Sequence, residues 1–105
     1  MTEPLPARIQ VSPKVMVQEL DGESVLLDLK SERYYGLDDV GTRMWQHLAE
    51  RGDPATACAR IVAEYGADEA TVRRDLAELI GKLAAAGLVT VGDPIEDGGA
   101  AGQAP

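Results

Sequence analysis

Residues 15–37, VMVQELDGESVLLDLKSERYYGL, carry the strongest structural signal in the chain. Asp21-Gly22 lies between two runs rich in aliphatic residues. Asp-Gly in this position favours a type I′ hairpin turn, because both central residues of that turn need positive φ. A second polar turn follows at residues 30–32. The segment therefore predicts a three-stranded antiparallel meander with strands at Val15–Leu20, Glu23–Leu29 and Arg33–Leu37.

Three helices are predicted downstream, each between an Asp and a Gly. The first begins at Asp38 or Asp39 and ends near Gly52, the second runs from Asp53-Pro54 to Gly66, and the third runs from Asp68 to Gly87. An Asp side chain can accept from the free N–H groups of a first turn, and Gly adopts the left-handed conformation after a last turn.

Each predicted helix carries an apolar stripe at helical spacing. The stripes are Val40, Met44, Trp45 and Leu48; then Ala55, Cys58, Ala59, Val62 and Tyr65; then Val72, Leu76, Leu79, Ile80 and Leu83. Leu88–Val91 is predicted as a short closing strand. The predicted fold class is α+β: a winged helix-turn-helix with a three-stranded antiparallel meander, three helices and that closing strand.

The two ends of the chain differ from this unit. Residues 1–13 contain three prolines and little periodicity, so they are interpreted as a flexible N-terminal arm. Residues 92–105 are rich in Gly, Ala and Pro, and such a segment buries too little apolar surface to offset the entropy of ordering it. We expect a disordered tail there and one folded domain at residues 14–91.

Composition excludes several classes of partner. The formal net charge is −8, from 18 acidic against 10 basic residues, which disfavours nucleic acid and anionic membrane surfaces. No apolar run approaches the ~20 residues of a membrane span, and the N-terminus does not resemble a secretory signal. The single cysteine cannot form an internal disulfide, which fits a reducing compartment. The expected location is the cytoplasm.

The sequence offers no constellation for catalysis. His47 is the only histidine and is expected to be surface or half-buried, while Cys58 lies on an apolar helix face and is interpreted as a buried, inert thiol. There is no ligand cluster with metal spacing and no Gly-rich phosphate loop after a strand. We therefore predict a protein that is not an enzyme and that needs no cofactor or metal.

The helix-turn-helix makes a DNA-binding regulator the alternative from another functional class. A DNA reader needs basic residues on its second helix to reach phosphates and base edges. Residues 68–86 carry the acids Asp68, Glu69, Asp75 and Glu78 against the bases Arg73, Arg74 and Lys82. This mixed, slightly acidic face favours a protein or peptide partner, and an interaction domain without a specific peptide is a third alternative.

The third strand, Arg33–Leu37, is expected to be an edge that is open to another chain. It has one neighbour in a meander, so its other side exposes unpaired N–H and C=O groups. Tyr34 and Tyr35 face opposite sides of the sheet, so one belongs to the core and the other covers sheet surface or lines a groove. The third helix supplies the other wall. Strand exchange between copies would also permit a homodimer.

Two runs, ESVLLDLKSERYYGLDDVGTRMWQHL and IVAEYGADEATVRRDLAELIGKLAAAGLV, resemble PqqD-like proteins, the recognition elements for leader peptides of ribosomally made, modified peptides. The shared features are Tyr35-Gly36-Leu37, Gly41, Trp45, Tyr65, Asp75-Leu76, Leu83 and Gly87-Leu88-Val89. The segment YYGLDDVGTRMW looks most like the stand-alone lasso-peptide form. The quinone-cofactor (PQQ) form is the close alternative, but Ser31-Glu32 stands where that form has Pro-Glu.

The resemblance implies a non-catalytic adaptor that binds a precursor's leader by strand addition. The leader would pair antiparallel with the Arg33–Leu37 edge, and Asp75 would accept a hydrogen bond or pair with a leader base. The implied partners are the precursor, a leader-cleaving cysteine protease and an ATP-dependent cyclase. The implied peptide-binding residues are Arg33, Tyr34, Tyr35, Gly36, Leu37, Val72, Asp75, Leu76, Leu79, Ile80 and Leu83.

Overall fold

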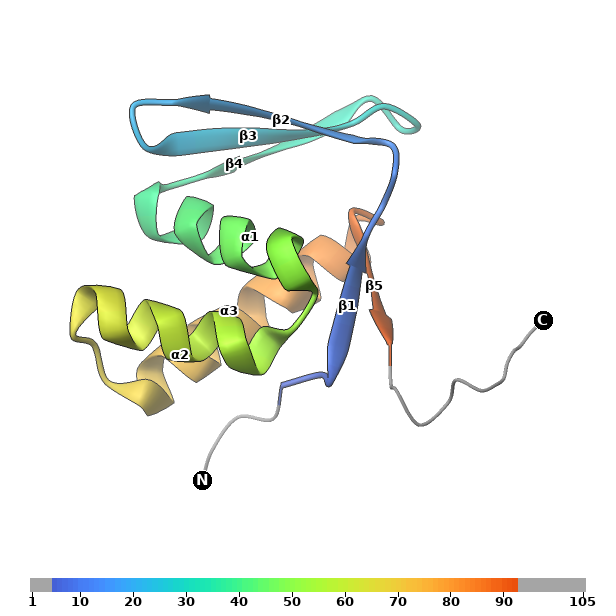
Figure 1. Ribbon diagram of the computed structural model, residues 1–105. Coiled ribbons are helices and arrows are strands. Elements are labelled where there is room, and N and C mark those ends of the chain that lie inside the picture. Colours follow the sequence, from blue (N-terminus) through green and yellow to red (C-terminus); the bar gives the residue numbers. More distant parts are fainter. Residues whose placement is uncertain (1–4, 93–105) are drawn as a thin grey trace.

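The computed structural model describes residues 5–92 and has the predicted fold class (Figure 1). Its elements are β1 (Arg8–Val11), β2 (Val15–Leu20), β3 (Glu23–Asp28), β4 (Arg33–Leu37), α1 (Asp39–Arg51), α2 (Pro54–Tyr65), α3 (Glu69–Ala85) and β5 (Val89–Gly92). The sheet β2-β3-β4 lies on one side of the helices, and β1 and β5 form a separate ribbon beside them (Figure 1).

The meander forms as predicted, because its two turns are fixed locally. Asp21 and Gly22 both have positive φ, 54° and 84°, as a type I′ turn requires. Leu20 therefore pairs with Glu23, and the β2–β3 register continues from there to Val15 and Asp28. In the second turn the Asp28 carboxylate accepts from the Ser31 hydroxyl at 2.9 Å and from the Lys30 N–H at 3.0 Å. These hydrogen bonds, that of Ser31 first, lower the pKa of Asp28.

The predicted Asp caps are confirmed at all three helices. Asp38 accepts from the Gly41 N–H at 2.7 Å, and Asp68 accepts from the Thr71 N–H at 3.0 Å. Asp53 accepts from two N–H groups of α2 and from the Thr56 hydroxyl, which lowers the pKa of its carboxyl. The caps fix where each helix begins, and so fix the position of α1 directly after β4.

A single core joins the sheet and the helices. Its buried members are Ile9, Leu26, Met44, Trp45, Leu48, Ala57, Cys58, Ile61, Val72, Leu76, Ile80, Leu83, Leu88 and Val89. The stripe predicted for α2 is partly wrong, because Ala55, Ala59 and Tyr65 are exposed whereas Ala57 and Ile61 are buried. Alanines on several faces of this short helix made its apolar pattern ambiguous, and Ile61 sets the buried face.

The prediction of a flexible arm over residues 1–13 is wrong for residues 8–11, which form β1. This strand pairs antiparallel with β5, from Arg8 opposite Gly92 to Val11 opposite Val89. Ile9 is buried, and its N–H donates to the Gly52 carbonyl at 2.9 Å. Gly52 has φ 67°, and an added Cβ would lie 2.5 Å from the Ile9 carbonyl oxygen, so this approach needs glycine.

Gly92, assigned to the tail, is the last residue of β5, and the remaining tail at residues 93–105 lies outside the described residues. Within residues 5–92, no helix is both long enough and apolar enough to cross a membrane.

Candidate functional site

Strand β4 is an edge of the three-stranded sheet. The strand order is β2-β3-β4, so β4 pairs with β3 on one side. Within residues 5–92, no strand pairs with its other side, and β1, which could have covered an edge, pairs with β5 instead. The row of backbone groups along this side of β4 is therefore open to an incoming chain.

The ladder alternation identifies which backbone groups face the open side. The two-residue turn makes Leu20 and Glu23 a hydrogen-bonded pair, and antiparallel pairs alternate between bonded and non-bonded. Val25 and Leu27 then bond toward β2, whereas Ser24, Leu26 and Asp28 bond toward β4. The register sets these last three opposite Leu37, Tyr35 and Arg33. The N–H and C=O groups of Tyr34 and Gly36 therefore point to the open edge.

The two adjacent tyrosines of β4 separate as the pleat requires. Tyr35 is half-buried and packs against the core, on the same face as Leu37. Tyr34 is on the opposite, outer face and is 72% exposed. Arg33 is exposed at the far end of the strand.

A cleft of about 630 Å³ lies between the end of β4, α1 and α3. Its lining residues are Gly36, Leu37, Asp38, Val40, Gly41, Met44, Asp75 and Leu79. The cleft exists because the Asp38 cap starts α1 immediately after β4, so the first turn of the helix closes one end. An extended chain on the open edge would have every second side chain facing this cleft.

The structure brings together only part of the predicted site. Gly36, Leu37, Asp75 and Leu79 meet in the cleft. Four other predicted residues of α3 lie on its buried face and anchor the helix to the core, namely Val72, Leu76, Ile80 and Leu83. Leu79 and Ile80 were both expected to contact the peptide, but Ile80 is 2% exposed and lies in the core, whereas Leu79 lines the cleft.

Sequence reasoning missed the contribution of α1 to the cleft, namely Asp38, Val40, Gly41 and Met44. The signal was present, because an Asp cap directly after an edge strand must bring the next helical turn beside that strand.

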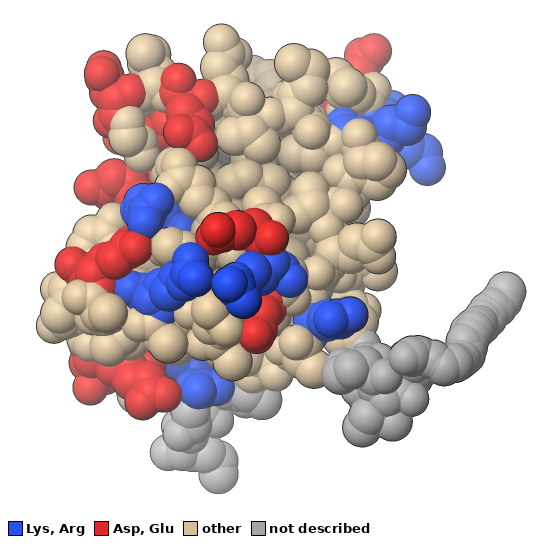
Figure 2. Space-filling view, in the orientation of Figure 1, with Lys and Arg blue, Asp and Glu red and all other residues tan. Residues whose placement is uncertain are grey.

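Carboxylates give the cleft a negative character. Asp75 is 51% exposed, with the Arg74 guanidinium 3.6 Å away, and one Asp38 oxygen is used by the helix cap. Figure 2 shows acidic side chains gathered at the end of the sheet that holds the β2–β3 turn. The arrangement favours an apolar ligand with a donor or basic group and disfavours an acidic one.

The residues considered for catalysis lie elsewhere. His47 was expected at or near the surface, but it is 8% exposed, and its Nε2 lies 2.9 Å from Glu64 Oε2. Arg43 Nη2 lies 3.2 Å from the same nitrogen, so Nε2 has a partner in either tautomer: it donates to Glu64 or accepts from Arg43. Cys58 is buried as predicted, and burial raises the pKa of its thiol, which makes it a poor nucleophile. Among residues 5–92, no group of three His, Cys, Asp or Glu side chains could hold a metal ion.

A winged helix with an open edge strand beside a cleft lined by apolar side chains and two carboxylates defines a class of domain that can accept an extended segment of another chain. A family model described as Coenzyme PQQ synthesis protein D (PqqD) matches residues 23–89, and the chain belongs to this family. Its members are non-catalytic peptide-binding domains, so the prediction that the chain is not an enzyme is confirmed.

Two solved structures are similar to the chain. One is TbiB1 in complex with the TbiA(beta) leader peptide, at 37% identity and a TM-score of 0.72, covering 88% of this chain and 99% of that one. The other is lasso peptide synthetase B1 complexed with the leader peptide, at 28% identity and a TM-score of 0.71, covering 80% of this chain and 99% of that one. Comparison with the curated proteins finds no match.

Proposed function

We propose that this chain binds the leader segment of a ribosomally made precursor peptide by strand addition to β4. The observation that carries the proposal is the side of β4 that no strand within residues 5–92 covers, where Tyr34 and Gly36 present their backbone groups next to the cleft. The two similar structures are each in complex with a leader peptide, which supports a leader peptide as the ligand.

In the proposed complex the leader lies antiparallel to β4. Its backbone pairs with Tyr34 and Gly36, and alternate side chains enter the cleft against Leu37, Met44 and Leu79. Asp75 accepts from a donor or basic group of the leader. The buried residues Val72, Leu76, Ile80 and Leu83 hold the wall of the cleft in place instead of touching the ligand.

The energetics permit useful affinity. Each buried anchor side chain contributes about 1.5–3 kcal/mol. Each edge hydrogen bond contributes about 0.5–1.5 kcal/mol net. Ordering a flexible leader costs about 2–5 kcal/mol. Two or three anchors with several hydrogen bonds therefore reach about −8 kcal/mol, which corresponds to a micromolar complex.

We further propose that the pathway makes a lasso peptide and that the adaptor works in the cytoplasm. The similarity to lasso peptide synthetase B1 supports this choice over the quinone-cofactor pathway, as does Ser31-Glu32 in place of Pro-Glu. The adaptor would then deliver the precursor to a leader-cleaving cysteine protease and an ATP-dependent cyclase.

Blocking the edge tests the proposal. Gly36→Pro removes an N–H that faces the open side and leaves the β3–β4 bonds in place, so affinity for the TbiA(beta) leader peptide should fall at least about tenfold. Fluorescence anisotropy measures the affinity, and thermal unfolding checks the fold. Val17→Pro is the matched control, because the same alternation directs the Val17 N–H to the opposite edge of the sheet. Equal binding by wild type and a folded Gly36→Pro variant would contradict strand addition.

A further inference from the structure

The outer face of the sheet, turned away from the helices, carries several exposed apolar side chains. Side chains alternate along each strand, and Glu19 faces the helices, where it accepts from Gln46 at 2.9 Å. The outward residues are therefore Met16, Gln18, Leu20, Glu23, Val25, Leu27, Tyr34 and Gly36. Leu20 is 74% exposed and Val25 is 42% exposed, which is unusual for side chains of this kind in neighbouring strands.

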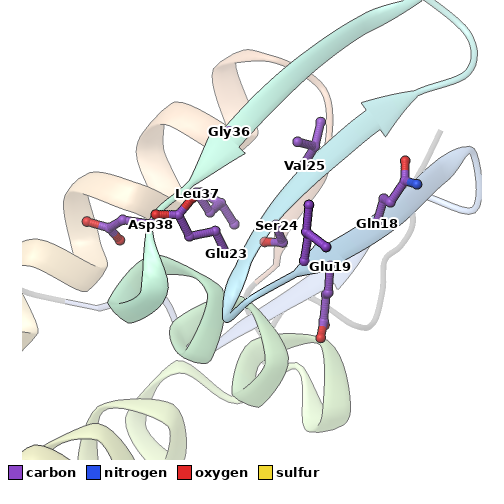
Figure 3. A pocket seen from close by; sticks show the side chains of 9 residues that line it. Gln18, Glu19, Glu23, Ser24, Val25, Gly36, Leu37 and Asp38 are labelled. Carbon is purple, nitrogen blue, oxygen red and sulfur yellow. The ribbon is translucent and has the colours of Figure 1, made fainter.

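This face is hollowed at the end of β4. A pocket of about 670 Å³ is lined by residues of all three strands, including Gln18, Leu20, Glu23, Val25 and Gly36. Figure 3 shows Gln18 and Val25 pointing away from α1 and Glu19 pointing toward it. No atom lies within 4 Å of the position that a Cβ of Gly36 would take, so the missing side chain leaves the pocket open at the edge of the sheet.

The pocket and the cleft lie on the two faces of the same stretch of β4. Both are lined by Gly36, Leu37 and Asp38. A strand added to β4 has one residue directly opposite Gly36, and its side chain must point to the outer face. The residues on either side of it point to the cleft. The absent Gly36 side chain leaves room for that outward residue to lean over β4 toward Val25.

We propose that the outer pocket is a second specificity site, which takes one bulky apolar or aromatic side chain of the bound peptide. This inference rests on the proposed function and adds to it. This side chain belongs to the peptide residue next to one whose side chain enters the cleft. The domain therefore contacts two adjacent peptide residues, one on each face of the sheet. Leu20 and Val25 supply apolar contact, and an aromatic ring covering an edge glycine is favourable. Glu23 and Asp38 on the rim exclude an acidic residue.

A double-mutant cycle between the pocket and the peptide tests this. Gly36→Val keeps the backbone N–H, suits a strand and places a branched side chain in the open space at the edge of the pocket, so the domain should remain folded. Affinity for the TbiA(beta) leader peptide should fall about tenfold. In an alanine scan of that peptide, one position should cost wild type about tenfold but cost the variant less than about twofold. Its two neighbours should cost both proteins equally.

A Met16→Val variant is the matched control, because it alters the same outer face but lies outside the pocket and away from the strand that pairs with the peptide. It should show no coupling at the position that couples to residue 36. If the peptide binds wild type but no position couples to Gly36→Val, the second site does not exist while strand addition stands. If the peptide does not bind wild type, both proposals fail.

Discussion

Two leucines about one turn apart on α3 have different surroundings. Leu76 is fully buried in the core, whereas Leu79 is partly buried and lines the cleft. Leu76→Ala should lower the free energy of unfolding by about 2–5 kcal/mol, and Leu79→Ala by less than about 1.5 kcal/mol. Leu79→Ala should still weaken leader binding about fivefold or more, because it removes a wall of the cleft.

Urea unfolding and anisotropy with the TbiA(beta) leader peptide measure the two effects on the same samples. The two variants serve as controls for each other. Leu76→Ala should cause the larger loss of stability, and the loss of affinity in Leu79→Ala should be large relative to its small loss of stability. A folded Leu79→Ala variant with wild-type affinity would show that the cleft does not hold the peptide.

At the scale of residues, the sequence identified the apolar residues of α3 as candidates for the core or the binding site. It could not show which of them face the core and which face the cleft. The apolar residues of α3 at positions 72, 76, 79, 80 and 83 all fit one broad helix face. Which flank opens to solvent depends on where β4 and α1 pack, and this information is not local to α3. The burial of His47 was missed for the same reason, because its partner Glu64 lies on the next helix.

At the scale of elements, the parts with local signals were predictable. The Asp21-Gly22 turn and the Asp caps at 38, 53 and 68 act within a few residues, and each produced the expected boundary. The closing strand was predicted, but β1 and its pairing with β5 were not predictable in this way. Strand β1 is four residues long and pairs with β5 about eighty residues later. No local sequence signal in either strand indicates its distant partner.

The ribbon contributes to stability through Ile9. This side chain is 5% exposed in the core, and we expect Ile9→Ala to lower the free energy of unfolding by about 2–4 kcal/mol. The neighbour Gln10 is exposed on the same strand, so Gln10→Ala should change it by less than about 0.5 kcal/mol. Chemical unfolding of both variants checks this. Equal, small effects would show that residues 8–11 behave as the flexible arm first expected.

Helices α1 and α2 are joined by the Glu64 carboxylate. It accepts from Arg43 at 2.6 Å and lies 2.9 Å from His47 Nε2, and these contacts, Arg43 first, hold the pKa of Glu64 below its ordinary value. A carboxyl whose pKa is lower in the folded state stabilises the fold above its unfolded pKa, and this contribution is lost as the pH falls.

Glu64→Gln should therefore be less stable than wild type above about pH 5, and the difference should shrink toward zero below about pH 3. Asp28 and Asp53 also have lowered pKa values and remain in both proteins, so the difference isolates Glu64. Urea unfolding across this pH range measures it. A difference that does not vary with pH would mean that the charge of Glu64 has no part in joining the helices.

At the scale of the whole molecule, the charge distribution separates this winged helix from a DNA reader. Arg73 and Arg74 on α3 lie near Glu69 and Asp75, at 3.3 Å and 3.6 Å. Figure 2 shows acidic side chains beside the basic ones on the visible face. With a net charge of −8, the molecule repels a phosphate backbone, although its helix-turn-helix has the shape that DNA readers use.

The dependence of binding on salt concentration distinguishes a peptide-binding domain from a DNA-binding regulator. A domain that neutralises six or more phosphates loses about 10³-fold in affinity between 50 and 200 mM salt, because bound counterions are released. We expect no duplex binding at 50 mM salt at tens of micromolar protein. Affinity for the TbiA(beta) leader peptide should change less than about threefold between 50 and 500 mM, since apolar anchors and backbone hydrogen bonds are weakly screened. Duplex binding with a steep salt slope, together with loss of that binding in Arg73→Ala, would instead assign α3 to a DNA groove.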